Sequence, residues 1–138
     1  MIGNAQIQED LVTLLKAELS VTSLLASSAE VREASFMGGD FSYPTLRIKV
    51  ENNSPFDNAD PCDHASVVFS ILCYSEEASS KSCQDLAAAV NNFLHRRFIT
   101  GTGYKIPRLR SSGLGGPGPI DQNTWMVRCG FVGNVRPT

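Results

Sequence analysis

Apolar residues recur at helical spacing in two separate segments of the chain. In residues 6–26 the apolar stripe contains Ile7, Leu11, Leu14, Leu15, Leu19, Leu24 and Leu25. In residues 79–97 it contains Cys83, Leu86, Ala87, Val90, Phe93 and Leu94. A spacing of three and four residues places such side chains on one face of an α-helix. We therefore expect two amphipathic helices, the second with Ser79 or Ser80 as its N-cap.

Four other segments alternate between apolar and polar residues, which is typical of β-strands. They cover residues 41–50, 64–74, 104–110 and 124–132. Both faces of the second segment are largely apolar, so we expect it to be a central strand covered on both sides. Pro107 interrupts the third segment and favours an edge strand or a bulge there. In the last segment Trp125, Val127, Cys129 and Phe131 are expected to point inward.

The order of these elements is α-β-β-α-β-β, which predicts an α+β fold. We expect a four-stranded, mainly antiparallel sheet with two helices packed on one face. Extended loops are predicted at about residues 51–63 and 111–123. The second loop is rich in Gly and Pro between residues 111 and 119, so we expect it to be mobile in the free subunit.

Length and composition indicate one ordinary globular domain over residues 1–138. The chain has 138 residues, of which 42% are hydrophobic and 19% are charged. A domain of this size buries enough surface to fold without disulfides or a metal. No apolar run approaches the ~20 residues of a membrane helix, and the first residues lack a signal-peptide pattern. The four cysteines form no C-x-x-C pair, which favours synthesis in a reducing cytoplasm.

The net charge of −2 conceals an uneven distribution. Residues 1–85 contain 13 acidic and 5 basic side chains, whereas residues 86–138 contain 1 acidic and 7 basic side chains. Such a split indicates either contact with nucleic acid or two sides of a subunit that attract each other in an assembly. The candidate interface residues are Asp57, Asp60, Asp63, Arg96, Arg97, Lys105, Arg108 and Arg110.

No catalytic, metal or cofactor site can be assembled from the sequence, so we expect the protein not to be an enzyme. The histidines are His64 and His95, and His95 lies beside two arginines on the polar side of its helix. The sequence Cys62-Asp63-His64 is not a tetrahedral ligand set, and a solvated acidic loop is the simpler interpretation. Cys73, Cys83 and Cys129 fall on apolar faces, where a cysteine acts as a small hydrophobic residue.

Nucleic-acid binding stays open as an alternative. A four-stranded sheet with two helices is the shape of the common single-strand RNA-binding module, and Tyr104 lies among the basic residues. That module stacks bases on exposed strand aromatics. Here Phe69, Trp125 and Phe131 are assigned to core faces, which argues against it.

The longer pattern resembles a known family. Residues 8–26 look like the opening helix of bacteriophage tail-completion proteins, and Tyr43-Pro44 followed by a strand is similar to the next segment of that group. The strand at 67–75, the short polar link and the Ala/Leu-rich helix at 78–93 resemble the middle of the tail terminator and minor-tail-protein-U-like families of long-tailed phages. The strand at 125–132 also fits.

This resemblance implies a virion structural protein that forms a homo-oligomeric ring, often a hexamer in the family. Such a ring caps the tail tube, stops its polymerisation and offers the docking surface for the head. The implied partners are the tail tube protein, a neck or head-completion protein, and phage DNA that passes through the lumen without sequence-specific binding. No membrane partner is implied. The implied location is the tail or neck of the virion, after assembly in the host bacterial cytoplasm. A neck or head-closure protein is the nearest alternative.

Overall fold

Three long antiparallel strands form the middle of the sheet in the computed structural model, which describes residues 3–34, 42–55, 65–121 and 123–138. They are β2 (Thr45–Pro55), β3 (Ala65–Glu76) and β8 (Thr124–Pro137), with β3 between the other two. Shorter strands complete the sheet: β1 (Val31–Glu33), β4 (Ile99–Gly101), β5 (Tyr104–Ile106), β6 (Arg110–Leu114) and β7 (Gly118–Asp121).

The sheet has eight strands within the described residues, so the prediction of four strands was wrong. Their order is β1-β2-β3-β8-β5-β4, and β6 and β7 pair with the same outer edge of β8 as β5 does. Among the strand pairs that the structure describes, only β1–β2 is parallel, which confirms a mainly antiparallel sheet. The missed strands β1, β4, β6 and β7 are three to five residues long, and the predicted strand at 104–110 is present as the short β5. Segments that short show little alternation in a sequence.

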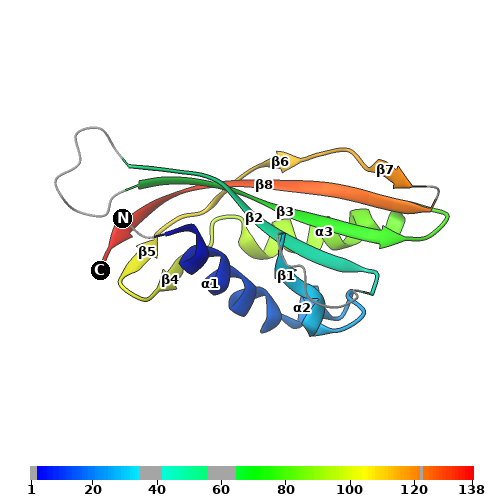
Figure 1. Ribbon diagram of the computed structural model, residues 1–138, viewed down its shortest axis with the longest axis horizontal. Helices are drawn as coiled ribbons and strands as arrows, with labels where there is room; N and C mark the ends of the chain where they lie inside the picture. The colour runs from blue at the N-terminus through cyan, green and yellow to red at the C-terminus, as the bar shows by residue number, and fades with distance from the viewer. Residues whose placement is uncertain (1–2, 35–41, 56–64, 122) are drawn as a thin grey trace.

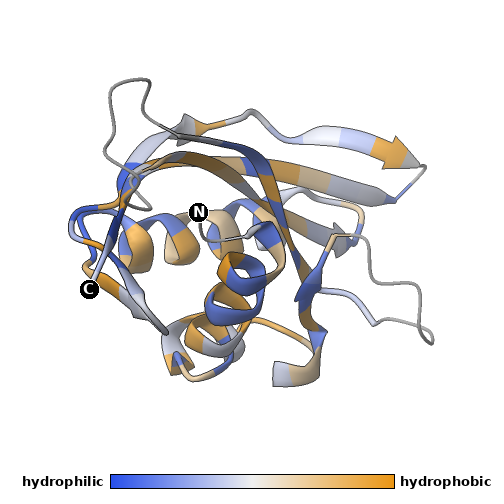
Figure 2. Ribbon diagram, turned by 60° about the vertical axis from the view of Figure 1, so that its left-hand side comes forward, coloured by the Kyte–Doolittle hydropathy of each residue, from blue (hydrophilic) through white to orange (hydrophobic). Residues whose placement is uncertain are grey.

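The two long helices pack on one face of the sheet, as predicted (Figure 1). They are α1 (Asn4–Lys16) and α3 (Lys81–Leu94), and the short α2 (Leu19–Thr22) and the 3-10 turn η1 (Ser28–Glu30) lie between α1 and β1 in sequence. Figure 2 shows the sheet curving around these helices. The apolar sides of both layers therefore meet in one core.

The core lies between the helices and the alternating inward residues of β2, β3 and β8. Phe69 of β3 stacks on its register partner Phe131 of β8, with ring centroids 5.4 Å apart. Val127, Cys129 and Phe131 are buried as predicted, whereas Trp125 is only partly buried against the core. The prediction that β3 is central is confirmed, but the helices cover only one of its two faces.

The first helix is shorter than the apolar pattern of residues 6–26 predicts. It ends at Lys16, and the Glu18 carboxylate then accepts a hydrogen bond from the amide of Ser20 at 3.3 Å and caps α2. Leu19, which the pattern places on the buried stripe, is 79% exposed. The capping hydrogen bond of Glu18 competes with continuation of α1. A side-chain acceptor at Glu18 favours the start of a new helix, α2.

Two predicted loops contain strands instead. β2 continues through residues 51–55, so only residues 56–64 separate it from β3, and these lie outside the described residues. Residues 110–114 and 118–121 pair with β8 as β6 and β7, which contradicts a mobile Gly/Pro loop. Backbone groups beside a long strand gain partners by joining its ladder. Gly and Pro are tolerated there because no other strand of the described residues pairs with the outer edge of β6 or β7.

Candidate assembly surface

The uneven charge of the sequence becomes a separation across the sheet. Residues 1–85 form α1 and β1 to β3, and residues 86–138 form β4 to β8. In the strand order β1-β2-β3-β8-β5-β4 the change from acidic to basic therefore falls between β3 and β8. The two lateral edges of the sheet consequently belong to chain halves of opposite net charge.

Four of the predicted arginines are brought together at the basic edge. The amide of Arg96 donates to the Leu109 carbonyl at 2.6 Å, and the amide of Leu109 donates to the Arg97 carbonyl at 3.0 Å. Arg96 has a positive φ of 66°, which turns the chain after α3 so that these two segments lie side by side. We call Arg96, Arg97, Arg108 and Arg110, all of which are exposed, the arginine cluster.

His95 also belongs to this turn. Its Nδ1 accepts a hydrogen bond from the amide of Ser111 at 3.0 Å. The ring is exposed, as predicted, and it accepts the hydrogen bond of a backbone amide at the outer edge of β6. The guanidinium of Arg97 lies 4.0 Å from the centroid of the Phe93 ring, and its Nε donates to the Phe93 carbonyl at 2.9 Å. These contacts orient the end of α3 beside the start of β6.

Lys105 lies at the same end of the sheet but in β5, where its register partner is Arg136 of β8. Arg108 and Arg110 line a hollow of about 510 Å³ together with Gly133 and Asn134. Sequence reasoning missed Arg136 because it ended the last strand at residue 132. Arg136 extends the basic surface along β8.

The predicted acidic residues Asp57, Asp60 and Asp63 lie outside the described residues. The residues that flank them are Pro55 and Ala65, which are register partners, and Ala65 also pairs with Val135. Pro55 and Ala65 therefore lie at the end of the sheet that carries Arg136 and Lys105.

The face of the sheet without helices carries a polar cross-strand contact. Glu51 of β2 forms an ion pair with Arg128 of β8 at 3.0 Å and accepts a hydrogen bond from the Ser70 hydroxyl at 2.8 Å. The Ser70 hydrogen bond and then the Arg128 hydrogen bond lower the pKa of Glu51. Around this contact lie half-buried apolar side chains: Val68, Leu72, Tyr74, Met126 and Val132.

The described cysteines are enclosed in the core. Cys73, Cys83 and Cys129 are buried and free, as predicted. Burial raises the pKa of the Cys73 thiol well above its ordinary value and also raises that of Cys83. Both thiols are therefore protonated at neutral pH, which is the less nucleophilic form. Cys62 and His64 lie outside the described residues.

The described part of the chain offers neither a metal-binding cluster nor a membrane-spanning helix. Within it, no group of three or more His, Cys, Asp or Glu side chains is arranged to hold a metal ion. Among its helices, none has the length and apolar content needed to cross a membrane.

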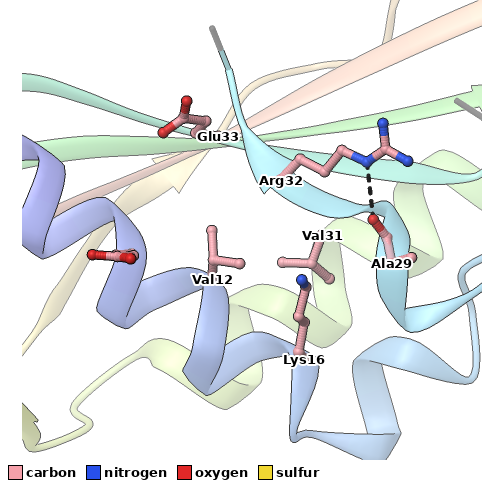
Figure 3. Close-up of a pocket in the computed structure, with 7 residues that line it drawn as sticks. Val12, Lys16, Ala29, Val31, Arg32 and Glu33 are labelled. Atoms are coloured by element: carbon pink, nitrogen blue, oxygen red, sulfur yellow. Dashed lines mark hydrogen bonds between the residues drawn. The ribbon is translucent and has the colours of Figure 1, made fainter. Parts of the chain in front are cut away.

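A groove lies at the opposite, β1 edge of the sheet, between α1 and β1. It has a volume of about 350 Å³, and the residues that line it are Glu9, Val12, Lys16, Ala29, Val31, Arg32 and Glu33. Figure 3 shows Val12 from α1 and Val31 from β1 pointing toward each other across it. The Nε of Arg32 donates to the Ala29 carbonyl at 3.0 Å, and its Nη2 lies 3.2 Å from Glu30. We call this site the α1–β1 groove.

Comparison with solved structures identifies the same fold elsewhere. A chain of the virion of a native gene transfer agent particle matches with a TM-score of 0.77 and 15% sequence identity, over 96% of both chains. A second solved chain matches with a TM-score of 0.65 and 14% identity, over 97% of this chain and 93% of that one. No protein-family model and no curated protein matches the sequence. At such low identities the likeness shows a shared fold.

Proposed function

We propose that this protein is a virion structural protein that assembles into a homo-oligomeric ring at the head-proximal end of a phage tail. The observation that carries the proposal is the fold shared with a gene transfer agent virion chain over 96% of both chains. A match over 96% of both chains means that the likeness covers nearly the whole subunit and not one part of it. The sequence resemblance to tail terminator proteins points to the same kind of assembly.

The distribution of charge supports a head-to-tail ring. In a heterologous interface two different patches of each subunit meet, and a closed rotation gives a ring. The two sheet edges belong to chain halves with 13 acidic and 5 basic, and 1 acidic and 7 basic, side chains. The opposite net charges of these two halves favour a head-to-tail orientation over a contact between like halves. The arginine cluster and Lys105 lie on the basic side of that interface.

In this proposal the protein acts by binding and without catalysis, cofactor or metal. Its partners are further copies of itself, up to a hexamer, the tail tube protein and a neck or head-completion protein. DNA passes through the lumen without sequence-specific contacts, and no membrane is involved. The protein is located in the tail or neck of the virion after assembly in the bacterial cytoplasm.

A neck or head-closure protein is the second candidate, because the shared fold supports a virion role without specifying the position in the particle. The binding partner discriminates the two: a terminator ring binds the tail tube, and a neck ring binds the head connector.

A single-strand nucleic-acid module is the third candidate, and the arginine cluster is the observation that favours it. Base stacking needs exposed aromatic side chains on the sheet. On the face without helices, the described residues of β2, β3 and β8 offer only Tyr74, which is half-buried. A salt-dependent shift of a labelled oligonucleotide by the monomer would support this candidate over the ring.

The test of the proposed function is the mass of the purified protein by light scattering, alone and mixed with tail-tube protein. We expect a closed ring in at least one of the two samples. A strict monomer in both, indifferent to tube protein, would overturn the proposal.

A further inference from the structure

The face of the sheet without helices carries a row of basic side chains where β5 and β6 meet the end of β8 (Figure 1). Residues 131, 133 and 135 of β8 are buried, so the alternate residues Asn134 and Arg136 point away from the helices. Lys105 is the register partner of Arg136 and lies between two buried residues of β5, so it shares this face.

Arg108 and Arg110 reach the same region from the segment that leads into β6. They flank the buried Leu109, whose amide and carbonyl are both hydrogen-bonded to the turn after α3. The register partner of Arg110 is Val132, which is half-buried on the face without helices. Both arginines line the hollow of about 510 Å³ together with two residues of β8, and we call this site the Arg108–Arg110 hollow.

The charge around this hollow is locally unbalanced. Among the described residues that line it, the two arginines carry the only charges. Arg97 and Arg128 already have contacts, because Arg97 donates to a carbonyl of α3 and Arg128 forms an ion pair with β2. Within the described part of the chain, four basic side chains of this region form no hydrogen bond and no ion pair: Lys105, Arg108, Arg110 and Arg136. Their N–H donors are therefore available to a ligand.

The chemistry of this surface fits phosphate groups. A planar guanidinium binds phosphate oxygens through two parallel N–H donors, and the side-chain amide of Asn134 adds a neutral donor beside the two arginines. A protein–protein contact is anchored by large apolar side chains, and none of the exposed large hydrophobic residues in the described chain lines this hollow. Protein–DNA interfaces are instead polar and strongly positive.

The surface fits a duplex better than a single strand. Single strands are bound largely by stacking of their bases on aromatic side chains. On this face Tyr74 pairs with Met126, at the other end of β3 and β8 from Arg136. Phosphates recur along a duplex backbone, and Lys105 and Arg136 continue the row of cations beyond the hollow.

We propose that the Arg108–Arg110 hollow binds the phosphate backbone of duplex DNA and that Lys105 and Arg136 contact further phosphates. This inference goes beyond the ring function, because all four residues belong to one subunit and no neighbouring copy completes the site. Phosphate contacts carry no base information, so the affinity is independent of sequence. The guanidinium of Arg97 lies over Phe93 of α3, on the side of the helices, and stays available for a contact with the next subunit.

The first test compares two double variants by fluorescence anisotropy with a short labelled duplex. Arg108→Gln with Arg110→Gln removes the charges of the hollow, and Arg96→Gln with Arg97→Gln removes two exposed charges that do not line it. We expect the first variant to bind at least about tenfold more weakly. Its slope of log affinity against log salt should fall by about 2, because two phosphate contacts are lost. The control should leave both quantities nearly unchanged, and thermal unfolding checks that both variants are folded.

A measurement on the unmodified protein keeps the test decisive if a variant disturbs the fold or the assembly. Backbone amide NMR shifts are followed while duplex DNA of two sequences, single-stranded DNA, inorganic phosphate or polyglutamate is added. We expect both duplexes to shift residues 108–110 and 132–136 at equal concentrations. We expect single strands and polyglutamate to bind at least about tenfold more weakly.

The outcomes separate this proposal from the ring function. Equal affinities of the two double variants, shifts confined to other residues, or equally tight binding of single strands or polyglutamate would overturn the duplex site. Binding of inorganic phosphate without binding of the duplex would overturn it as well. If the unmodified protein is monomeric alone and with tube protein but binds the duplex through residues 108–110, the ring function is overturned and the phosphate site stands.

Discussion

The hydroxyl of Tyr104 donates a hydrogen bond to the carboxylate of Asp10, which joins residues 94 positions apart in the sequence. Tyr104 is fully buried in β5, and Asp10 belongs to α1. Gln6 adds hydrogen bonds to both Asp10 oxygens at 3.2 Å. This contact connects the first helix to the basic edge of the sheet.

Removal of that hydroxyl should destabilise the fold. We expect Tyr104→Phe to lower the free energy of unfolding by about 1–3 kcal/mol, because a partly buried carboxylate loses its tyrosine donor. Urea denaturation measures the change. Tyr74→Phe removes the same atom from a half-buried tyrosine on the face without helices and is expected to cost less. Equal effects of the two variants would contradict a special role for the Asp10 contact.

The same contact predicts alkaline sensitivity. Burial, followed by the hydrogen bond to Asp10, raises the pKa of Tyr104 well above its ordinary value of 10. The unfolded chain therefore loses the Tyr104 proton at a lower pH than the folded chain does. Its contribution to stability is fully present below about pH 10 and decreases as the pH rises further. Urea midpoints from about pH 8 to about pH 11 should fall more steeply for the native sequence than for Tyr104→Phe.

A close approach at Gly133 should be intolerant of a side chain. A Cβ at this position would lie 2.7 Å from Cγ2 of Ile106 and 3.1 Å from Cδ1 of Leu109, and both neighbours are buried. We expect Gly133→Ala to lower the free energy of unfolding by about 1–3 kcal/mol through overpacking. Gly116→Ala is the control, because a Cβ there meets nothing within 4 Å. A native-like denaturation midpoint for Gly133→Ala would show that this contact relaxes without cost.

The arginine cluster predicts a salt-dependent association. We expect replacement of Arg96, Arg97, Arg108 and Arg110 by Glu to weaken ring formation and to reduce its dependence on ionic strength, since exposed charges are screened by salt. Light scattering at two salt concentrations measures both effects. An oligomer that survives the fourfold reversal unchanged would rule out the electrostatic part of the proposed interface.

The Glu51 contact can be tested by titration. Because the hydrogen bond from Ser70 and the hydrogen bond and charge of Arg128 all lower the pKa of Glu51, we expect Ser70→Ala and Arg128→Ala each to raise that pKa. NMR of the Glu51 side chain measures it. The side chains of Arg128 and Glu51 are 46% and 33% exposed, so the ion pair itself should add no more than about 1 kcal/mol to stability. A pKa of Glu51 that stays unchanged in either variant would contradict the contribution of that partner.

The predictions from sequence were most accurate for segments in which the apolar pattern repeats over many residues, because such a pattern depends on residues close together in the chain. The apolar stripe from Cys83 to Leu94 correctly indicated α3, and the alternation of residues 64–74 correctly indicated the central strand β3. The stripe of residues 6–26 was misleading because it ignores the Glu18 cap, which ends one helix and begins another. The four arginines and Lys105 were recognised by charge alone, but Arg128 and Arg136 were not. The ion pair of Arg128 with Glu51 depends on strand pairing, and Arg136 lies in the part of β8 beyond the predicted strand.

The sequence by itself determined a mixed helix and sheet fold with buried cysteines, an exposed His95 and a change of charge near residue 85. These properties depend on composition and on side-chain period, which are local. Only the tertiary structure decided that β1 pairs in parallel with β2, that the Gly/Pro segment joins β8, and that the charge change falls between β3 and β8. Strand pairing is a contact between distant segments, selected by how the whole chain buries its apolar faces and satisfies its backbone hydrogen bonds.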